Sequence, residues 1–172
     1  MIRSRLGFSI ALLVFVLDQL VKWIVTHPLG INEIGAQLVL LPIFNFTYTQ
    51  NEGISLGLFN ATNPLGRWML VAMTSIIAIG VAVWIGREKN RIDQIALGMV
   101  LGGALGNILD RVRFGYVVDF ADLHFGDFRP FLVFNVGDAA ISIAVVILLL
   151  RGFLARKDQK EGPSPEEKIE HA

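Results

Sequence analysis

The chain has 172 residues, of which 53% are hydrophobic and only 17% are charged, and its mean hydropathy is +0.58. Soluble domains usually contain about 25% charged residues, so this composition argues against a water-soluble enzyme and against a disordered chain. The formal net charge is zero, which gives no electrostatic case for a nucleic-acid partner. The absence of cysteine excludes a thiol nucleophile, a cysteine-ligated metal and a disulfide framework.

Four apolar stretches are long enough to cross a bilayer, whose hydrocarbon core requires about 20 apolar residues in a helix. In chain order they are residues 6–26, 68–86, 92–110 and 131–150. They predict a membrane α-helical fold, a bundle of four transmembrane helices that forms one integral membrane domain over residues 1–154. No small-residue cleavage site follows the first stretch, so we expect a retained span rather than a signal peptide.

The basic residues predict the orientation of these spans. Arginine and lysine precede the first span, join the second to the third and follow the fourth, whereas segment 27–67 holds only Arg67. Because basic residues favour cytoplasmic loops, we expect both termini in the cytoplasm and segments 27–67 and 111–130 on the outer side. Three arginines in the second outer segment weaken this bias. The charge-rich end, residues 155–172, is typical of a disordered cytoplasmic tail.

Two short segments in the outer regions have the pattern of β-strands. Residues 43–49 alternate strictly, with aromatic residues on one face and polar residues on the other, which predicts a half-buried strand. Residues 116–120 are a second strand candidate. Both fit a small extracytoplasmic β-sheet on the outer membrane surface, which would bring Asp119 close to the start of the fourth span.

Ionisable residues inside the spans are functional candidates, because each costs roughly 2.5–3.5 kcal/mol to insert. Asp18 and Lys22 lie four residues apart on one helical face of the first span. They form either a structural ion pair or a support for an active site. Asp138 has no such partner in the fourth span. We expect it about two turns inside that span, on the same face as Asn135.

Further polar side chains gather at the outer end of the predicted bundle. Asn107 and Arg111 share one face of the third span and offer hydrogen-bond donors and a positive charge, and Asn51 comes from the first outer segment. The glycines spaced by four residues from Gly98 to Gly106 are typical of helices that pack closely.

Asp119 and Asp138 indicate hydrolysis by paired carboxyl groups. Two carboxyl groups held close together do not both ionise readily, so one pKa rises and the pair shares a proton. The ionised group accepts a proton from water, while the protonated group donates to the carbonyl oxygen of an amide. Because such a pair titrates as a unit, neither role is assigned to one residue.

Two other functions remain open as alternatives. A G-x-S-x-G pattern around Ser55 would make a serine-type site with His124 or Lys22, although that motif belongs to soluble α/β folds. Ionisable residues inside spans also occur in proton-coupled transporters, but four spans without an inverted repeat argue against one. There is no H-E-x-x-H pattern, and we expect no metal site.

Taken together, the motifs resemble those of the lipoprotein signal peptidases (signal peptidase II), which are bacterial aspartic peptidases with four spans. The family motifs are D-x-x-x-K at Asp18 to Lys22, N-x-G at Asn51 to Gly53, G-G-x-x-G-N-x-x-D-R at Gly102 to Arg111, V-V-D-F at Val117 to Phe120 and F-N-x-A-D at Phe134 to Asp138. The resemblance covers about Leu12 to Leu150. One departure is Gly137, where the family usually has alanine, since glycine costs about 1 kcal/mol in a helix.

The resemblance implies that Asp119 and Asp138 are the catalytic pair. It implies that the site is shaped and the substrate backbone held by Asn51, Gly53, Asn107, Arg111 and Asn135, with Asp18 and Lys22 as structural polar residues. The implied substrates are prolipoproteins with diacylglyceryl on a cysteine, cleaved just before that cysteine at the outer (periplasmic) face of the cytoplasmic membrane. Contact with membrane lipid, inhibition by globomycin-type cyclic peptides and the absence of metal or organic cofactors are further implications.

Overall fold

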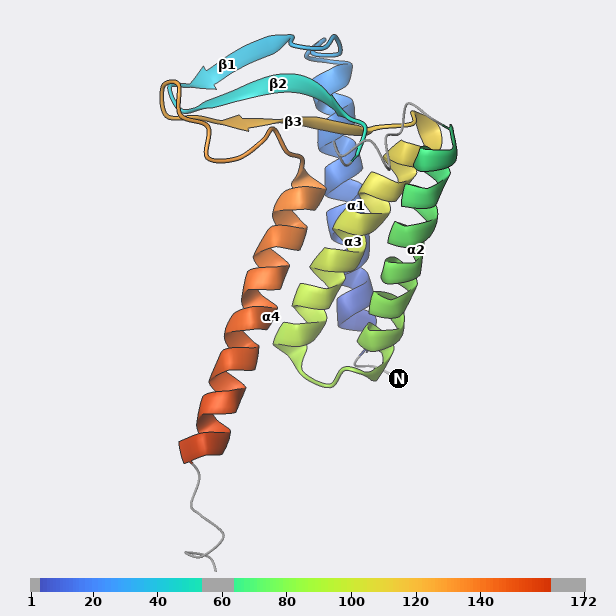
Figure 1. Ribbon diagram of the computed structural model, residues 1–172, viewed down its shortest axis with the longest axis vertical. Coiled ribbons are helices and arrows are strands. Elements are labelled where there is room, and N and C mark those ends of the chain that lie inside the picture. Colours follow the sequence, from blue (N-terminus) through green and yellow to red (C-terminus); the bar gives the residue numbers. More distant parts are fainter. Residues whose placement is uncertain (1–3, 54–63, 162–172) are drawn as a thin grey trace, which may run out of the picture.

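In the computed structural model, the described residues are 4–53 and 64–161, with side chains described for 5–53 and 64–154. Within them, four helices form a bundle, and a three-stranded sheet lies across one end of it (Figure 1). The helices are α1 (Ser4–Thr26), α2 (Pro64–Arg87), α3 (Arg91–Arg113) and α4 (Val136–Glu161). Each is long and apolar enough to cross a membrane, which confirms the predicted membrane α-helical class.

The fourth helix begins later than the predicted span. The apolar run starts at residue 131, but α4 starts at Val136, because Asn135 caps the helix. Asn135 Oδ1 accepts a hydrogen bond from the backbone N–H of Asp138 at 2.9 Å, and Asp138 Oδ2 accepts one from the backbone N–H of Asn135 at 3.3 Å. This is the reciprocal pattern of a capping box. Asp138 therefore lies in the first turn of α4, not two turns inside it.

The other helix ends extend or shift the predicted spans. The bundle helices α2 and α3 continue past the predicted limits 68–86 and 92–110. The tail expected to be disordered from residue 155 is helical as far as Glu161, since its composition is rich in helix-forming residues. Residues 162–172 lie outside the described residues. The described part of α1 begins at the end of the bundle opposite the sheet, and the described part of α4 ends there too (Figure 1).

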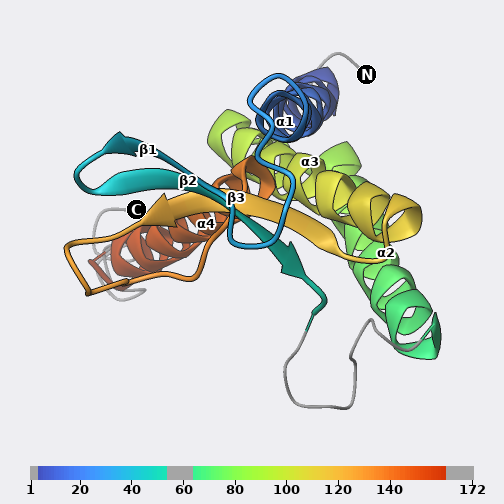
Figure 2. The same cartoon turned by 90° about the horizontal axis from the view of Figure 1, so that it is seen from above.

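The third helix, α3, is the centre of the bundle and packs against α1, α2 and α4 (Figure 2). Its glycines make close approach possible. A Cβ added at Gly102 would collide with the backbone carbonyl of Ala11 in α1. A Cβ added at Gly103 would collide with the backbone carbonyl of Gly137 in α4. The packing role predicted for these glycines is confirmed, and it brings α4 against the polar end of α3.

The sheet has the antiparallel order β1 (Gln37–Leu41), β2 (Phe44–Asn51), β3 (Val117–Leu123). Strands β2 and β3 confirm the two predicted strands, with bounds moved toward the C-terminus. Strand β1 was not predicted, because its sequence QLVLL does not alternate and all five residues are exposed. The sheet packs on the end of α1 through a core that includes Val25 and Phe120.

A β-bulge in β2 ends the strict alternation predicted through residue 49. The pairing of β2 with β3 shifts between Phe46 and Thr49, and Thr47 and Tyr48 are both buried. Beyond the bulge, Thr49 lies opposite Asp119 in the register. Asn51 pairs with Val117, two residues before Asp119, and its side chain reaches the Asp119 carboxyl group.

Candidate active site

The Asp119 carboxyl group, on β3, is buried and only 2% exposed. Asn51 Nδ2 donates to its Oδ2 at 3.0 Å, and Asn135 Nδ2 donates to its Oδ1 at 2.6 Å. Burial, and after it the charge of Asp138, raise the pKa of Asp119 from 3.8 to about 7, against the opposing effect of the two amide hydrogen bonds. This carboxyl group therefore holds a proton up to near-neutral pH.

The Asp138 carboxyl group is held at the start of α4. Asn107 Nδ2, from α3, donates to Asp138 Oδ1 at 2.8 Å, while the capping box supplies a backbone N–H to Oδ2. The N-terminus of a helix carries a partial positive charge that stabilises a carboxylate. These contacts fix the orientation of the Asp138 carboxyl group at this end of the bundle.

The side-chain amides of Asn135 and Asn107 connect the two carboxyl groups. Asn135 Nδ2 donates both to Asp119 Oδ1 and to Asn107 Oδ1, the latter at 3.1 Å. Asn107 in turn donates to Asp138. The structure therefore brings Asp119, Asp138 and the two asparagines, which the sequence placed on three separate elements, into one hydrogen-bond network.

The Asn51 amide is oriented by its own turn. Gly53 N–H donates to Asn51 Oδ1 at 3.0 Å, so that Asn51 Nδ2 is left to face Asp119. Gly53 has φ +107°, a backbone conformation that favours glycine. In this structure the N-x-G pattern thus forms a turn that orients the Asn51 amide beside the carboxyl pair.

Behind the carboxyl pair lies a buried ion cluster formed by Asp18, Lys22 and Asp110. Lys22 Nζ is 2.7 Å from Asp18 Oδ2 and 2.7 Å from Asp110 Oδ2, and it donates to Asn107 Oδ1 at 3.3 Å. Asp18 Oδ1 accepts the backbone N–H of Gly137 at 2.9 Å. The predicted Asp18–Lys22 ion pair is present, and it is bonded to Asn107 and Gly137 beside the carboxyl pair. Its support of an active site stays a prediction.

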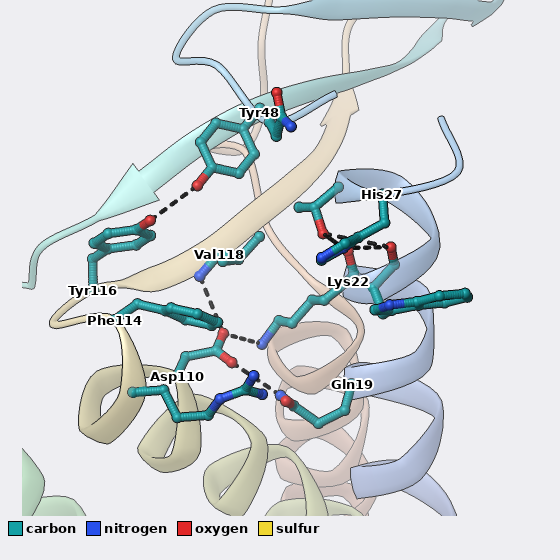
Figure 3. A pocket seen from close by; sticks show the side chains of 12 residues that line it. Gln19, Lys22, His27, Tyr48, Asp110, Phe114, Tyr116 and Val118 are labelled. Atoms are coloured by element: carbon teal, nitrogen blue, oxygen red, sulfur yellow. Dashed lines mark hydrogen bonds and ion pairs between the residues drawn. The ribbon is translucent and has the colours of Figure 1, made fainter. Parts of the chain in front are cut away.

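Sequence reasoning assigned no role to Asp110, the third member of this cluster. Asp110 is 1% exposed and also accepts hydrogen bonds from Gln19 and from the backbone of Val118 (Figure 3). The available signal was its spacing, three residues after Asn107 at the end of an apolar span. That spacing places both side chains on one face of α3.

Similarity to a known family covers most of the chain, since the family model of signal peptidase (SPase) II matches residues 10–154. The chain belongs to the signal peptidase II family. It is 55% identical over 150 residues to a lipoprotein signal peptidase of Sphingopyxis alaskensis, covering 87% of this chain and 86% of that one. It is 50% identical over 152 residues to that of Rhizorhabdus wittichii, covering 88% of each.

Solved structures agree with this assignment. A bacterial membrane enzyme superposes with a TM-score of 0.75 at 27% identity, covering 92% of this chain and 93% of that one. A second bacterial membrane enzyme superposes with a TM-score of 0.72 at 28% identity, covering 84% and 90%. The similarity confirms the resemblance inferred from the motifs, and signal peptidase II membership indicates a multi-pass inner-membrane peptidase rather than a transporter.

One cation beside the carboxyl pair of this signal peptidase II member has no hydrogen-bond or ion-pair partner within residues 5–53 and 64–154. Arg111 lies within electrostatic reach of Asp138 and Asp119, yet it forms no hydrogen bond or ion pair with another described residue, and its Nε is buried without a partner. Ser55, the nucleophile of the serine-type alternative, lies outside the described residues, and that alternative stays a prediction.

Proposed function

We propose that this signal peptidase II member is an aspartic endopeptidase that removes signal peptides from diacylglyceryl-modified prolipoproteins, cleaving just before the lipidated cysteine. The observation that carries the proposal is the raised pKa, about 7, of Asp119 in the same network as Asp138. A pair that retains one proton near neutral pH is what water-mediated amide hydrolysis requires. The names of the relatives support the substrate class.

In the proposed mechanism, Asp119 and Asp138 share one proton. The ionised carboxylate accepts a proton from water as the water oxygen attacks the scissile carbonyl carbon, and the protonated carboxyl donates to the carbonyl oxygen. The tetrahedral intermediate then collapses as its C–N bond breaks. The carboxyl group that took the proton from water donates it to the leaving amine, and the other carboxylate takes the proton back from a hydroxyl of the intermediate, which restores the shared proton. Because the two groups titrate together, the exchange of roles between them is part of the cycle.

The asparagines and Arg111 have distinct proposed tasks in this reaction. Asn51, Asn107 and Asn135 hold the carboxyl groups by the hydrogen bonds described above. Arg111 binds a backbone carbonyl oxygen of the substrate, since its guanidinium has no described partner and lies beside the pair. Prepositioned groups of this kind accelerate a reaction without reorganising as charge develops.

We further propose that the sheet end of the bundle faces the periplasm. Arg87, Lys89 and Arg91 lie at the opposite end, between α2 and α3, where the excess of basic residues favours the cytoplasm. The lipid chains on the substrate cysteine would stay in the bilayer and present the scissile bond at the interface. Binding energy from such remote groups lowers the barrier at the reacting bond.

The test of the substrate class is cleavage of matched precursors by purified protein in detergent. One precursor carries diacylglyceryl on its cysteine, and the other has the same sequence without the lipid. We expect cleavage of the lipidated precursor alone, with the new N-terminus at the modified cysteine. Equal cleavage of both precursors would contradict the proposed recognition of the lipid, and cleavage elsewhere would contradict the proposed position.

A further inference from the structure

A cavity whose lining does not include the carboxyl pair lies between the sheet and the ends of α1 and α3 (Figure 3). Its volume is about 360 Å³, within the range of about 300–1,000 Å³ typical of small-ligand sites. Strand β3 is the wall between the two sites. Val118 lines this cavity, whereas the side chain of its neighbour Asp119 joins the carboxyl network, because successive side chains on a strand point to opposite faces.

The floor of the cavity is already saturated with internal contacts. Asp110 accepts hydrogen bonds from Gln19 and from the backbone of Val118. It also forms an ion pair with Lys22, which pairs with Asp18 as well. One ammonium group is shared between two carboxyl groups, so the floor offers no unpaired cation. A charged ligand must therefore find its partner at the rim of the cavity rather than at its floor.

The rim carries an available cation. Arg113 is exposed, stacks over the ring of Phe114 at 4.8 Å from its centroid and forms no ion pair with a described carboxylate. A guanidinium held on an aromatic face is prepositioned for a phosphate oxygen. The electrostatics of the cavity mouth thus favour an anionic group at this point.

Two tyrosine hydroxyls add a neutral hydrogen-bond donor. Tyr48 Oη and Tyr116 Oη line the cavity 3.2 Å apart, so one hydroxyl hydrogen is used between them and one is left to donate (Figure 3). The hydrogen bond to Tyr48 and burial raise the pKa of Tyr116 to about 12, so the Tyr116 hydroxyl keeps its proton at neutral pH. An arginine and a free hydroxyl hydrogen are typical partners of a phosphate.

The surface outside the mouth is apolar and belongs to the spans. Trp23 is 53% exposed beside the cavity, and Leu20 and Val16 continue its face of α1 toward the middle of the helix, both exposed. Tryptophan at the end of a span is typical of the membrane interface. A ligand that reaches this mouth from the bilayer would find an apolar track for its chains and a polar cavity for its head.

We infer that this cavity binds the phosphate-bearing headgroup of a membrane phospholipid, with Arg113 on the phosphate, a tyrosine hydroxyl as second donor and the acyl chains along α1. A free phosphate ion and a lipid headgroup would present the same phosphate to this cavity. We propose that the phosphate belongs to a lipid of the leaflet at the sheet end of the bundle. The site is distinct from the proposed peptidase site, so it is tested by binding and not by cleavage.

The experiment is native mass spectrometry of the full chain, released from detergent after titration with dioleoylphosphatidylglycerol. We expect one lipid to bind wild type in preference to further lipids. Arg113→Gln is expected to weaken that binding about tenfold, the effect of losing one charge-assisted hydrogen bond. Tyr116→Phe, which keeps the ring, is expected to weaken it in the same direction. Arg129→Gln removes the same charge at the same end but outside the cavity, and wild-type binding is expected.

Three results would overturn the inference. If Arg113→Gln and Tyr116→Phe bound the lipid as tightly as wild type, the proposed contacts with the phosphate would be refuted. Equal retention of dioleoylglycerol, which lacks the phosphate, would show that the mouth recognises only apolar chains. Displacement of the lipid by inorganic phosphate would show that the source is a free anion rather than a lipid.

Discussion

Lys22 Nζ donates a hydrogen bond to Asn107 Oδ1 at 3.3 Å, which connects the buried ion cluster to the carboxyl network. Asn107 Oδ1 also accepts from Asn135, so two donors fix the orientation of the Asn107 amide. Its Nδ2 is thereby turned toward Asp138. The charge on α1 therefore positions a carboxyl group on α4 through one amide on α3.

Removal of the Lys22 charge should damage both stability and activity. We expect Lys22→Met to destabilise the protein by about 3–5 kcal/mol, because Asp18 and Asp110 lose their cation in a buried place. We also expect kcat/KM to fall by about tenfold or more, because the Asn107 amide loses a donor that orients it. Unfolding midpoints in detergent and cleavage kinetics measure the two effects.

A pH profile separates this positioning role from a merely structural one. The charge of Lys22 lowers the pKa of Asp119, so its loss should move the alkaline limb of the activity profile to higher pH. Lys89→Met changes an exposed lysine at the other end of the bundle and should leave all three measurements as in wild type. An unshifted profile and full activity in Lys22→Met would contradict the link.

The raised pKa of Asp119 predicts how wild-type activity depends on pH. A pKa raised from 3.8 to about 7 means that the shared proton is retained below about pH 7 and lost above it. Because the mechanism requires that proton, kcat/KM should decline as the pH rises through about 7. Steady-state cleavage measured between about pH 5 and pH 9 tests this. Constant activity up to about pH 9 would refute the sharing of a proton at this site.

Arg111 offers a test of substrate binding without a change in fold. We expect Arg111→Gln to lower kcat/KM on the order of tenfold to a hundredfold, since one charged donor to the substrate is lost. The unfolding midpoint should change little, because the guanidinium has no hydrogen-bond or ion-pair partner among the described residues. Arg129→Gln is the matched control for the kinetics, because Arg129 lies at the same end of the bundle but pairs with Asp122 and not with the carboxyl pair. Loss of stability with unchanged kinetics would reverse the assignment.

Helix packing gives a prediction that is independent of catalysis. A Cβ at Gly102 would meet the backbone carbonyl of Ala11, so Gly102→Ala should force α1 and α3 apart and destabilise the protein by about 1–3 kcal/mol. Gly80, in the middle of α2, has open space around it, and Gly80→Ala should be neutral or stabilising by up to about 1 kcal/mol. Unfolding midpoints that rank the two variants the other way would refute the packing role.

Much of the fold was predictable because membrane insertion imposes a simple rule on composition. Long apolar runs predicted all four helices, and the alternation around Phe46 predicted β2. The start of α4 was missed because apolar character continues through Phe131 and Leu132, outside the helix. The signal for the correct start was present, since Asn135 and Asp138 have the spacing of a capping box.

The candidate site was predictable as a set of residues but not as a network. Spacing placed Asp18 beside Lys22, but it does not show that Asp110, from a different helix, completes the cluster. Likewise, Asn135 reaches Asp119 only because β3 crosses the start of α4. Contacts between elements depend on tertiary packing, which the local patterns of one sequence do not contain.

The most direct test of the central claim is cleavage of the diacylglyceryl-modified precursor by Asp119→Asn and Asp138→Asn, purified in detergent beside wild type. Asp122→Asn is the matched control, because Asp122 is also buried on β3 but bonds Thr47 and Arg129 rather than the site. We predict that both site variants fold but cleave nothing, while Asp122→Asn remains active. Cleavage at the wild-type rate by either folded site variant would contradict the aspartate pair.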